Sequence, residues 1–200
     1  DTEMYKLRVY DLKGDDVPFQ IIKEESLINM DRRKRLLLRV SVPAFGVASY
    51  GINKTIGPKV KTIKDDGKEI IVTDSVKTVV IDRKTGLMTS FKVGEKEYLS
   101  GGAFALNVLN DNGDPWVLYD NLPEDKWVYT ESEYKQMLPD LSKSGVFENL
   151  ESVTVVEKGE LLTEVQSLFS LGESHAVVNY KIYKDEPYAD VNIHVLWNET

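Results

Sequence analysis

The residues best suited to chemistry form a dense run of carboxylates and aromatics between Asp111 and Asp120. Carboxylate and amide groups exchange hydrogen bonds with sugar hydroxyls, and aromatic faces pack against the apolar C–H side of a sugar ring. Four side chains of this run are therefore the candidate substrate-binding residues: Asp111, Asp114, Trp116 and Tyr119. The same composition also suits a turn-rich loop in which Asp and Asn cap backbone groups and Trp116 fills the core.

Catalysis or metal binding by this run has weaker support. Glycosidases need two carboxyl groups roughly 5–9 Å apart, and closeness in the sequence does not establish that separation for Asp111, Asp114 and Asp120. The spacing also departs from the calcium-binding loop, because Pro115 stands where a ligand would be expected. With no cysteine and two histidines, the chain is not expected to hold a structural zinc ion. We therefore predict no catalytic residue, metal ligand or cofactor within this chain.

Charge and composition narrow the range of partners. Residues 1–64 hold 13 Lys and Arg against 8 Asp and Glu, whereas residues 65–200 hold 12 against 25. Extended nucleic-acid binding needs a basic face, and most of this chain is acidic. No apolar run approaches the ~20 residues that span a bilayer. We expect neither nucleic acid nor a membrane as partner, and a cytoplasmic location, since no targeting segment is present.

The hydrophobic periodicity is that of strands almost throughout, which predicts an all-β fold with few or no helices. Residues 153–197 alternate apolar and polar side chains across three turn sequences, as expected of four antiparallel strands in one leaf of a sandwich. The polar run 82–85 followed by Gly86 predicts a hairpin turn in which the glycine adopts positive φ. Helical spacing is suggested at one place, residues 124–138.

The N-terminal part shows shorter strand-like runs. These fall at residues 7–10, 19–22 and 36–42. Residues 51–58 are interpreted as a connector, because two glycines and a proline bracket a short polar stretch. The sign of the charge changes just after it, so we place a domain boundary within residues 56–68.

The final strand-like stretch, residues 189–197, requires a neighbouring strand and a second layer over its apolar side chains. The sequence stops directly after it. We therefore expect the chain to be a piece of a larger protein. We also expect this strand to leave an exposed sheet edge, which is prone to pair with another copy.

Five stretches, taken in order, carry motifs that together span nearly the whole chain. They are residues 7–20 (Asp-x-x-Gly, then Val-Pro-x-Gln), 42–50 (Val-Pro-x-x-Gly-x-x-x-Tyr), 82–90 (Asp-x-x-x-Gly, ending in Ser), 111–116 (Asp-x-Gly-Asp-x-Trp) and 191–199 (ending in Trp-x-Glu). In this order they resemble the region that follows the catalytic domain in α-mannosidases of glycoside hydrolase family 38. Asp74-Ser75 and Val117 depart from the family pattern, which usually has Asn and Gly at these places.

The resemblance implies a domain organisation. It places a small antiparallel β-sandwich at residues 1–56, a linker at 57–68 and the opening part of a larger β-supersandwich, galactose-mutarotase-like, at 69–200. The nucleophilic aspartate and a divalent metal, usually zinc, would belong to the parent's N-terminal catalytic domain. The His and Asp motifs that bind that metal are absent from this sequence.

The resemblance also implies a function: a non-catalytic β-domain of a retaining α-mannosidase, inactive alone. Its partners would be the catalytic domain and downstream strands of the same chain, α-mannoside glycans, and a second copy through the exposed sheet edge. Asp111, Asp114, Trp116 and Tyr119 would face the catalytic domain or the substrate. The alternatives are a stand-alone carbohydrate-binding module and a structural or oligomerisation domain.

Overall fold

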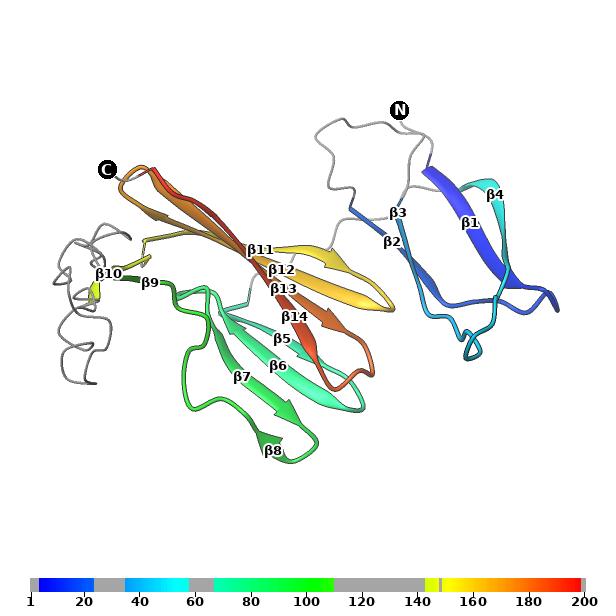
Figure 1. Cartoon of the computed structure of the whole chain (residues 1–200), viewed down its shortest axis with the longest axis horizontal. Coiled ribbons are helices and arrows are strands. Elements are labelled where there is room, and N and C mark those ends of the chain that lie inside the picture. The colour runs from blue at the N-terminus through cyan, green and yellow to red at the C-terminus, as the bar shows by residue number, and fades with distance from the viewer. Residues whose placement is uncertain (1–3, 24–34, 58–66, 110–142, 148, 199–200) are drawn as a thin grey trace, which may run out of the picture.

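The computed structural model of the 200-residue chain describes five stretches: residues 4–23, 35–57, 67–109, 143–147 and 149–198. The regular secondary structure of these stretches consists of β-strands, which form antiparallel sheets (Figure 1). The predicted all-β fold is confirmed. These stretches accordingly contain no helix that could cross a membrane. The helical spacing noted at 124–138 lies outside the described residues.

Four long strands near the C-terminus form one antiparallel meander. They are β11 (Asn149–Lys158), β12 (Leu162–Leu171), β13 (Ser174–Tyr183) and β14 (Ala189–Leu196), in that spatial order. Along β12, Val165 and Phe169 are buried, whereas Glu164 and Gln166 are half-buried on the opposite face. The four strands predicted from the alternation are confirmed.

A second sheet packs over the meander and completes a β-sandwich (Figure 1). Its strands, in spatial order, are β5 (Glu69–Thr73), β6 (Lys77–Asp82), β7 (Met88–Val93) and β8 (Lys96–Glu97). Burial of apolar side chains between the two sheets supplies the main stabilisation of such a layered fold. The residues of the shared core are Ile70, Val79, Ile81, Met88, Phe147, Val165, Phe169, Ala176, Val178, Tyr180 and Ile182.

The predicted hairpin turn between β6 and β7 is present and is tied to the facing sheet. Gly86 has a φ of 71°, and its backbone N–H donates to the Asp82 carbonyl at 2.8 Å. The Gly86 carbonyl accepts hydrogen bonds from Ser167 Oγ at 2.8 Å and Tyr180 Oη at 3.1 Å. Both donors are fully buried, so this turn is fixed by the sandwich interior as well as by its own sequence.

The N-terminal part consists of two-stranded ribbons. Strand β1 (Met4–Asp11) pairs with β4 (Tyr50–Gly57), and β2 (Phe19–Ile22) pairs with β3 (Arg35–Leu38). In Figure 1 these ribbons lie beside one end of the sandwich. The expected strand at 36–42 is shorter than predicted, since the chain leaves the sheet after Leu38.

The interpretation of residues 51–58 as a connector is wrong for residues 51–57, because Tyr50–Gly57 form β4, and Pro58 lies outside the described residues. Gly51 stands opposite Tyr10 in the antiparallel register. A Cβ atom on residue 51 would lie 2.3 Å from Cζ of Tyr10. The glycine therefore makes room for a cross-strand aromatic ring and does not end the strand.

Two short strands, β9 (Asn107–Leu109) and β10 (Lys143–Val146), pair antiparallel at the opposite end of the sandwich. They flank residues 110–142, which lie outside the described residues.

Candidate functional site

The four sequence-predicted site residues, Asp111, Asp114, Trp116 and Tyr119, all fall within 110–142, outside the described residues. Their role in substrate binding stays a prediction. The structure does describe the base of this segment, because β9 leads into it and β10 leads out of it.

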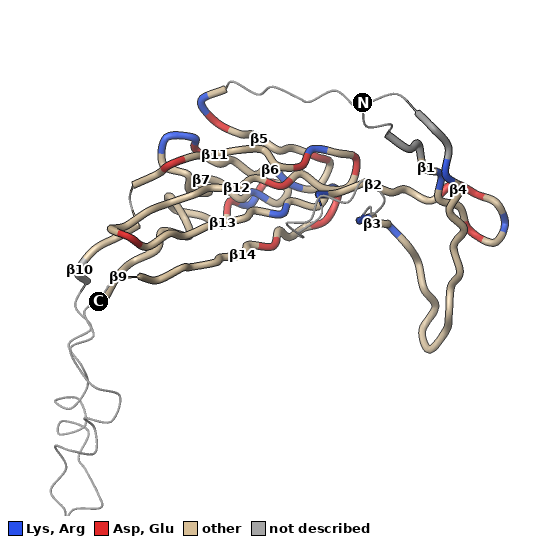
Figure 2. Tube along the Cα trace, turned by 90° about the horizontal axis from the view of Figure 1, so that it is seen from above, with Lys and Arg blue, Asp and Glu red and all other residues tan. Residues whose placement is uncertain are grey.

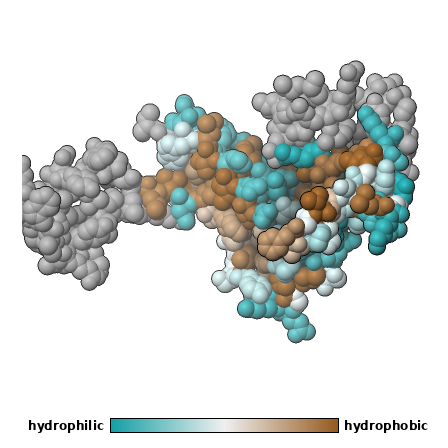
Figure 3. Space-filling view, turned by 45° about the vertical axis from the view of Figure 1, so that its right-hand side comes forward, coloured by the Kyte–Doolittle hydropathy of each residue, from teal (hydrophilic) through white to brown (hydrophobic). Residues whose placement is uncertain are grey.

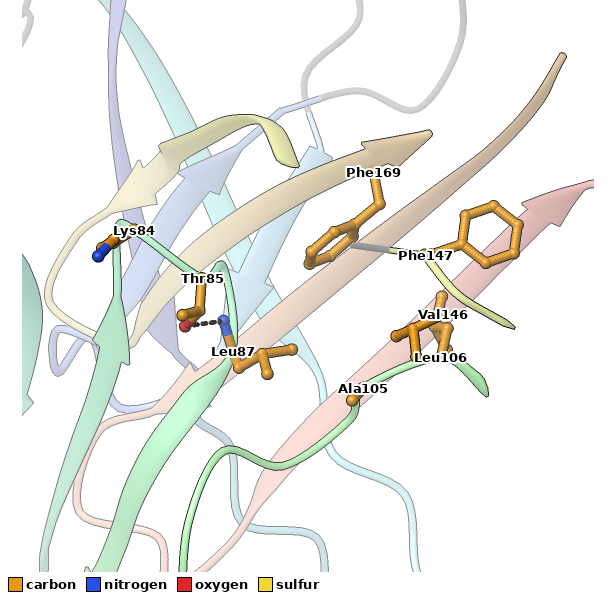
Figure 4. A pocket seen from close by; sticks show the side chains of 8 residues that line it. All are labelled: Lys84, Thr85, Leu87, Ala105, Leu106, Val146, Phe147 and Phe169. Carbon is orange, nitrogen blue, oxygen red and sulfur yellow. Dashed lines mark hydrogen bonds between the residues drawn. The ribbon is translucent and has the colours of Figure 1, made fainter. Parts of the chain in front are cut away.

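A small apolar pocket of about 220 Å³ lies at this base (Figure 4). Two phenylalanine rings and aliphatic side chains form most of its wall, and Lys84 and Thr85 add the polar groups. Thr85 Oγ1 is already engaged, since it donates to Asp82 Oδ2 at 3.1 Å and accepts from the Leu87 N–H at 3.4 Å. The lining residues are Lys84, Thr85, Leu87, Ala105, Leu106, Val146, Phe147 and Phe169.

The chemistry of this pocket is limited. No lining residue carries a carboxylate or an imidazole, so the pocket lacks the paired carboxyl groups that glycoside hydrolysis requires. It offers hydrophobic contact and one ammonium group. Such a wall suits packing of a neighbouring segment better than binding of a hydroxyl-rich ring.

The described residues also do not fit a divalent metal. Within residues 4–23, 35–57, 67–109, 143–147 and 149–198, no group of three or more His, Cys, Asp or Glu side chains could hold one. His194 is exposed on the polar face of β14, and His175 Nε2 lies 3.8 Å from Glu151 Oε1.

The strongest electrostatic feature is a buried ion pair at the β5–β6 turn. Lys77 Nζ donates to Asp74 Oδ2 at 2.7 Å, and the two side chains are 0% and 4% exposed. The same ammonium donates to the backbone carbonyl of Tyr183. The Asp74 carboxylate accepts three more hydrogen bonds, from the backbone N–H groups of Val76, Lys77 and Asp185.

This environment holds Asp74 in its ionised form. Burial alone would raise the pKa of Asp74, but the hydrogen bond from Lys77 and the three backbone donors outweigh it, so the pKa lies well below its usual range. A carboxylate so held cannot supply a proton near neutral pH. Its effect is to fasten the β5–β6 turn to the β13–β14 turn. In the sequence, Asp74 stands out only as a departure from a family pattern, and nothing local to it predicts the contact with Asp185.

A second set of contacts fastens the N-terminal ribbons to the sandwich, and its centre is Gln20 on β2. The Gln20 side chain is 8% exposed. Its Nε2 donates to the Leu162 carbonyl at 3.0 Å, and its Oε1 accepts from the N–H groups of Leu161 at 3.0 Å and Leu162 at 2.8 Å. One amide side chain thus satisfies three backbone groups at the β11–β12 turn.

Gly159 makes this approach feasible. A Cβ atom on residue 159 would lie 2.2 Å from Cδ of Gln20. Close by, the Lys23 N–H donates to the Glu157 carboxylate. Burial and the neighbouring Glu164 raise the pKa of Glu157, while its contact with Lys23 acts in the opposite direction.

Arg39, just after β3, adds an electrostatic contact to the β13–β14 turn. Its Nη2 donates to the Lys184 carbonyl, and its guanidinium lies 3.7 Å from Asp185 Oδ2 and 3.8 Å from Glu186 Oε1. Ser75 Oγ donates to Asp185 Oδ1 at 2.8 Å. The turn at residues 184–187 is therefore held from both the ribbons and the β5–β6 turn.

The comparison with protein families decides the identity of this sandwich. The model of the glycosyl hydrolases family 38 C-terminal domain matches residues 72–200, more than half of the chain. The chain belongs to this family. The family 38 resemblance found in the sequence is thereby confirmed over residues 72–200. A comparison with curated proteins finds no match.

The limits of the family 38 match separate the contacts within the domain from those that the N-terminal ribbons make with it. It begins within β5, so the buried Asp74–Lys77 pair and the Gly86 turn lie inside the family 38 C-terminal domain. Gln20 and Arg39 precede the matched residues and bind to the domain from outside. Gln20 falls in a family-like motif of the sequence, but no local pattern predicts its contact with the β11–β12 turn.

Proposed function

We propose that this chain is a non-catalytic β-domain region of a retaining α-mannosidase, which braces the catalytic domain and contributes loop contacts near the sugar site. The observation that carries the proposal is the match to the family 38 C-terminal domain over residues 72–200. The parent enzyme would hydrolyse the glycosidic bond of α-mannosides. Any divalent metal of the reaction would belong to its catalytic domain.

Three carboxyl groups in the described residues have a shifted pKa, and two of them, Asp74 and Glu97, support a structural role because they are held ionised. Asp74 is held ionised by Lys77 and backbone donors. Hydrogen bonds from the Ser90 hydroxyl and from three backbone N–H groups, among them that of Leu99, lower the pKa of Glu97 to about 2. A general acid must keep its proton near the working pH. Neither carboxyl group meets that condition.

Two buried or half-buried tyrosines are equally unsuited to proton transfer. Burial raises the pKa of Tyr180 to about 12. Burial, followed by a hydrogen bond to Asp190, raises the pKa of Tyr183 to about 12. Both hydroxyl groups donate to fixed protein acceptors and stabilise the fold.

The test of the proposal compares this chain with a longer protein that also carries the catalytic domain. On an aryl α-mannoside we expect the isolated chain to be inactive and the longer protein to release the aryl group with retention at the anomeric carbon. Hydrolysis by the isolated chain would contradict the non-catalytic role. Hydrolysis of a different glycoside by the longer protein, with no action on α-mannosides, would contradict the substrate.

The loop residues can be tested in the same longer protein. Asp111, Asp114, Trp116 and Tyr119 are proposed to contact the sugar, so Trp116→Ala should raise KM for an α-mannoside with a smaller change in kcat. Trp197→Phe, at the residue that directly follows β14, is the control and should leave KM unchanged. If the isolated chain itself binds mannosides, with a fluorescence change that is lost in Trp116→Ala, the chain is a carbohydrate-binding module in its own right.

A second candidate function, oligomerisation, is favoured by the position of β14 at the edge of its sheet. Within the described residues β14 pairs with β13 alone. Its apolar face is incompletely covered, because Ile193 is 41% and Val195 50% exposed. An antiparallel copy of β14 centred on Ile193 would place Val191 opposite Val195 and continue the apolar face.

Self-association through β14 is measured by sedimentation velocity on the isolated chain. Val195→Lys places a charge on the apolar face and should weaken a dimer by at least about tenfold. Asn192→Lys, on the polar face of the same strand, should not. A chain that stays monomeric up to about 100 μM would exclude this candidate.

A further inference from the structure

The connection between β3 and β4 exposes an unusual amount of hydrophobic surface. We call residues 40–49 the 40–49 loop. It is uncharged, as are the next residues as far as Asn53. Figure 2 shows it as an uncharged excursion extending well away from the strands. In Figure 3, hydrophobic surface lies on the right-hand side of the molecule as well as over its middle. Its large apolar side chains are exposed: Val40 44%, Val42 54%, Phe45 113% and Val47 92%.

The tip of the loop is a β-turn with an aromatic residue in an unfavourable position. The Gly46 N–H donates to the Pro43 carbonyl at 3.0 Å, which makes Phe45 the third residue of the turn. Phe45 has a φ of 55°, in the left-handed region where glycine or asparagine is normally found. A fully exposed phenylalanine held in that conformation gains nothing from the fold described, and such outliers cluster at functional sites.

The shape of the loop is fixed by its own residues. A Cβ atom on residue 46 would lie 2.5 Å from Cγ of Pro43, so Gly46 is what allows the turn to close. At the base, Tyr50 Oη donates to the Ser41 carbonyl at 3.0 Å. The Val-Pro-x-x-Gly-x-x-x-Tyr motif thus builds a preorganised loop whose apolar tip is free of contacts with the described part of the chain. Preorganisation of this kind reduces the entropy lost on binding.

The surroundings of the loop favour a protein cavity as its site. Binding to an anionic membrane or to nucleic acid uses basic residues beside the apolar group. The nearest basic residue on the N-terminal side is Arg39. Its guanidinium donates to the Lys184 carbonyl and lies beside Asp185 and Glu186. The loop itself is neutral. An uncharged tip with one protruding aromatic ring matches an apolar protein pocket, since buried aromatic anchors dominate such interfaces.

We propose that the 40–49 loop docks into an apolar cavity on the catalytic domain of the same glycosidase, with Phe45 as its anchor. This inference rests on the proposed function, from which the partner is taken. The loop precedes the family 38 match at residues 72–200, and the ribbons that carry it are fastened to the sandwich by Gln20 and Arg39. The ribbons would then join the sandwich on one side to the catalytic domain on the other.

The test compares amide hydrogen exchange of residues 44–48 in the isolated chain and in the longer protein that carries the catalytic domain. We expect exchange to be at least about tenfold slower in the longer protein, and Phe45→Ser to remove that difference. Phe45→Leu, which keeps an apolar anchor, should retain most of it. Leu12→Ser is the matched control, because Leu12 is 85% exposed on the β1–β2 turn and should leave the exchange unchanged.

Thermal unfolding gives a second measurement. Because Phe45 is exposed, Phe45→Ser should leave the melting temperature of the isolated chain unchanged, and it should lower that of the longer protein. Equal exchange of residues 44–48 in both proteins would overturn the proposal. So would protection that arises from a dimer of the isolated chain, or binding of that chain to phosphatidylserine vesicles that is lost in Phe45→Ser.

Neither measurement depends on hydrolysis, so the two proposals can fail separately. A longer protein that protects the loop but does not cleave α-mannosides contradicts the proposed function and leaves the docking intact. A longer protein that cleaves α-mannosides but leaves the loop exposed contradicts the docking alone.

Discussion

The sandwich of β5–β14 and the N-terminal ribbons of β1–β4 use polar side chains in opposite ways. Among the described residues, the sandwich encloses a core of eleven buried apolar side chains, and its buried polar groups fix turns beside that core. In the ribbons, the buried side chains among those described are Val9 and Gln20. A two-stranded ribbon is marginally stable by itself. Here the polar groups of the ribbons attach them to the sandwich.

This difference has a consequence for stability. Loss of a polar group inside the sandwich should destabilise the whole domain, because the core surrounds the site of the change. Loss of a polar group in the ribbons should release the ribbons and leave the sandwich folded. The following changes test that distinction, beginning with the largest expected effect.

Lys77→Ala should cost about 3–5 kcal/mol of the free energy of unfolding, because it leaves the Asp74 carboxylate buried without its charged partner. The measurement is urea unfolding followed by circular dichroism. Lys92→Ala, at an exposed position on β7, is the control and should have little effect. If Lys77→Ala costs no more than Lys92→Ala, the ion pair does not stabilise the sandwich.

Gly86→Ala should cost about 2–4 kcal/mol, because it combines backbone strain with overpacking. The φ of Gly86 is 71°, and an added Cβ would lie 2.6 Å from Cδ1 of Leu150 and 2.8 Å from Cζ of Phe169. Gly94→Ala provides a matched control with a φ of 58° and no atom within 4 Å. Both variants are measured by urea unfolding, and the difference between their losses of unfolding free energy gives the packing contribution at Gly86. Equal losses would show that the core rearranges around the added methyl group without cost.

Acid should weaken the sandwich through Asp74. Since the pKa of Asp74 is lowered in the folded state, its contribution is complete above the unfolded pKa and is lost as the pH falls toward the folded pKa. Between about pH 5 and pH 2 this single group should remove about 2–3 kcal/mol. In Asp74→Asn the free energy of unfolding should fall less over that range. Parallel pH curves for the two proteins would contradict this assignment.

Gln20→Ala should cost about 1–3 kcal/mol, and the loss should be local, because three buried hydrogen bonds to Leu161 and Leu162 disappear together. Hydrogen exchange should accelerate in β2 and β3 while the interior of β12 and β13 stays protected. Gln166→Ala is the control, because this amide bonds Asn179 on the outer face of the same sheet. Faster exchange throughout the sandwich would show that the ribbons are part of its cooperative unit.

Local patterns in the sequence were sufficient to predict most strands of the sandwich and one of its turns. Alternation along residues 153–197 identified β11 to β14 because the pleat of a strand sends successive side chains to opposite faces. The polar run before Gly86 identified the β6–β7 turn because few residues tolerate positive φ. The same local logic failed at β4, where Gly51 accommodates Tyr10 from a strand about forty residues earlier.

Local sequence patterns could predict only part of the candidate site. Composition singled out residues 111–120, which lie outside the described residues, and the domain limits at residues 56 and 69 stay predictions as well. The contacts at Gln20 and Arg39 carried no local signal, because each joins residues more than 140 positions apart. Phe45 could be located in a motif, but its full exposure became visible only in the folded chain.

The sequence by itself determined that the chain is all-β, where most strands of the sandwich run, and which family it resembles, since strand periodicity and turn chemistry are properties of neighbouring residues. Only the tertiary structure decided which polar groups are buried and what they hold together. Asp74, Gln20 and Arg39 acquire their roles from carbonyl and amide groups of the β11–β12 and β13–β14 turns. Those partners approach because two sheets must bury their apolar faces against each other, and no local pattern encodes that packing.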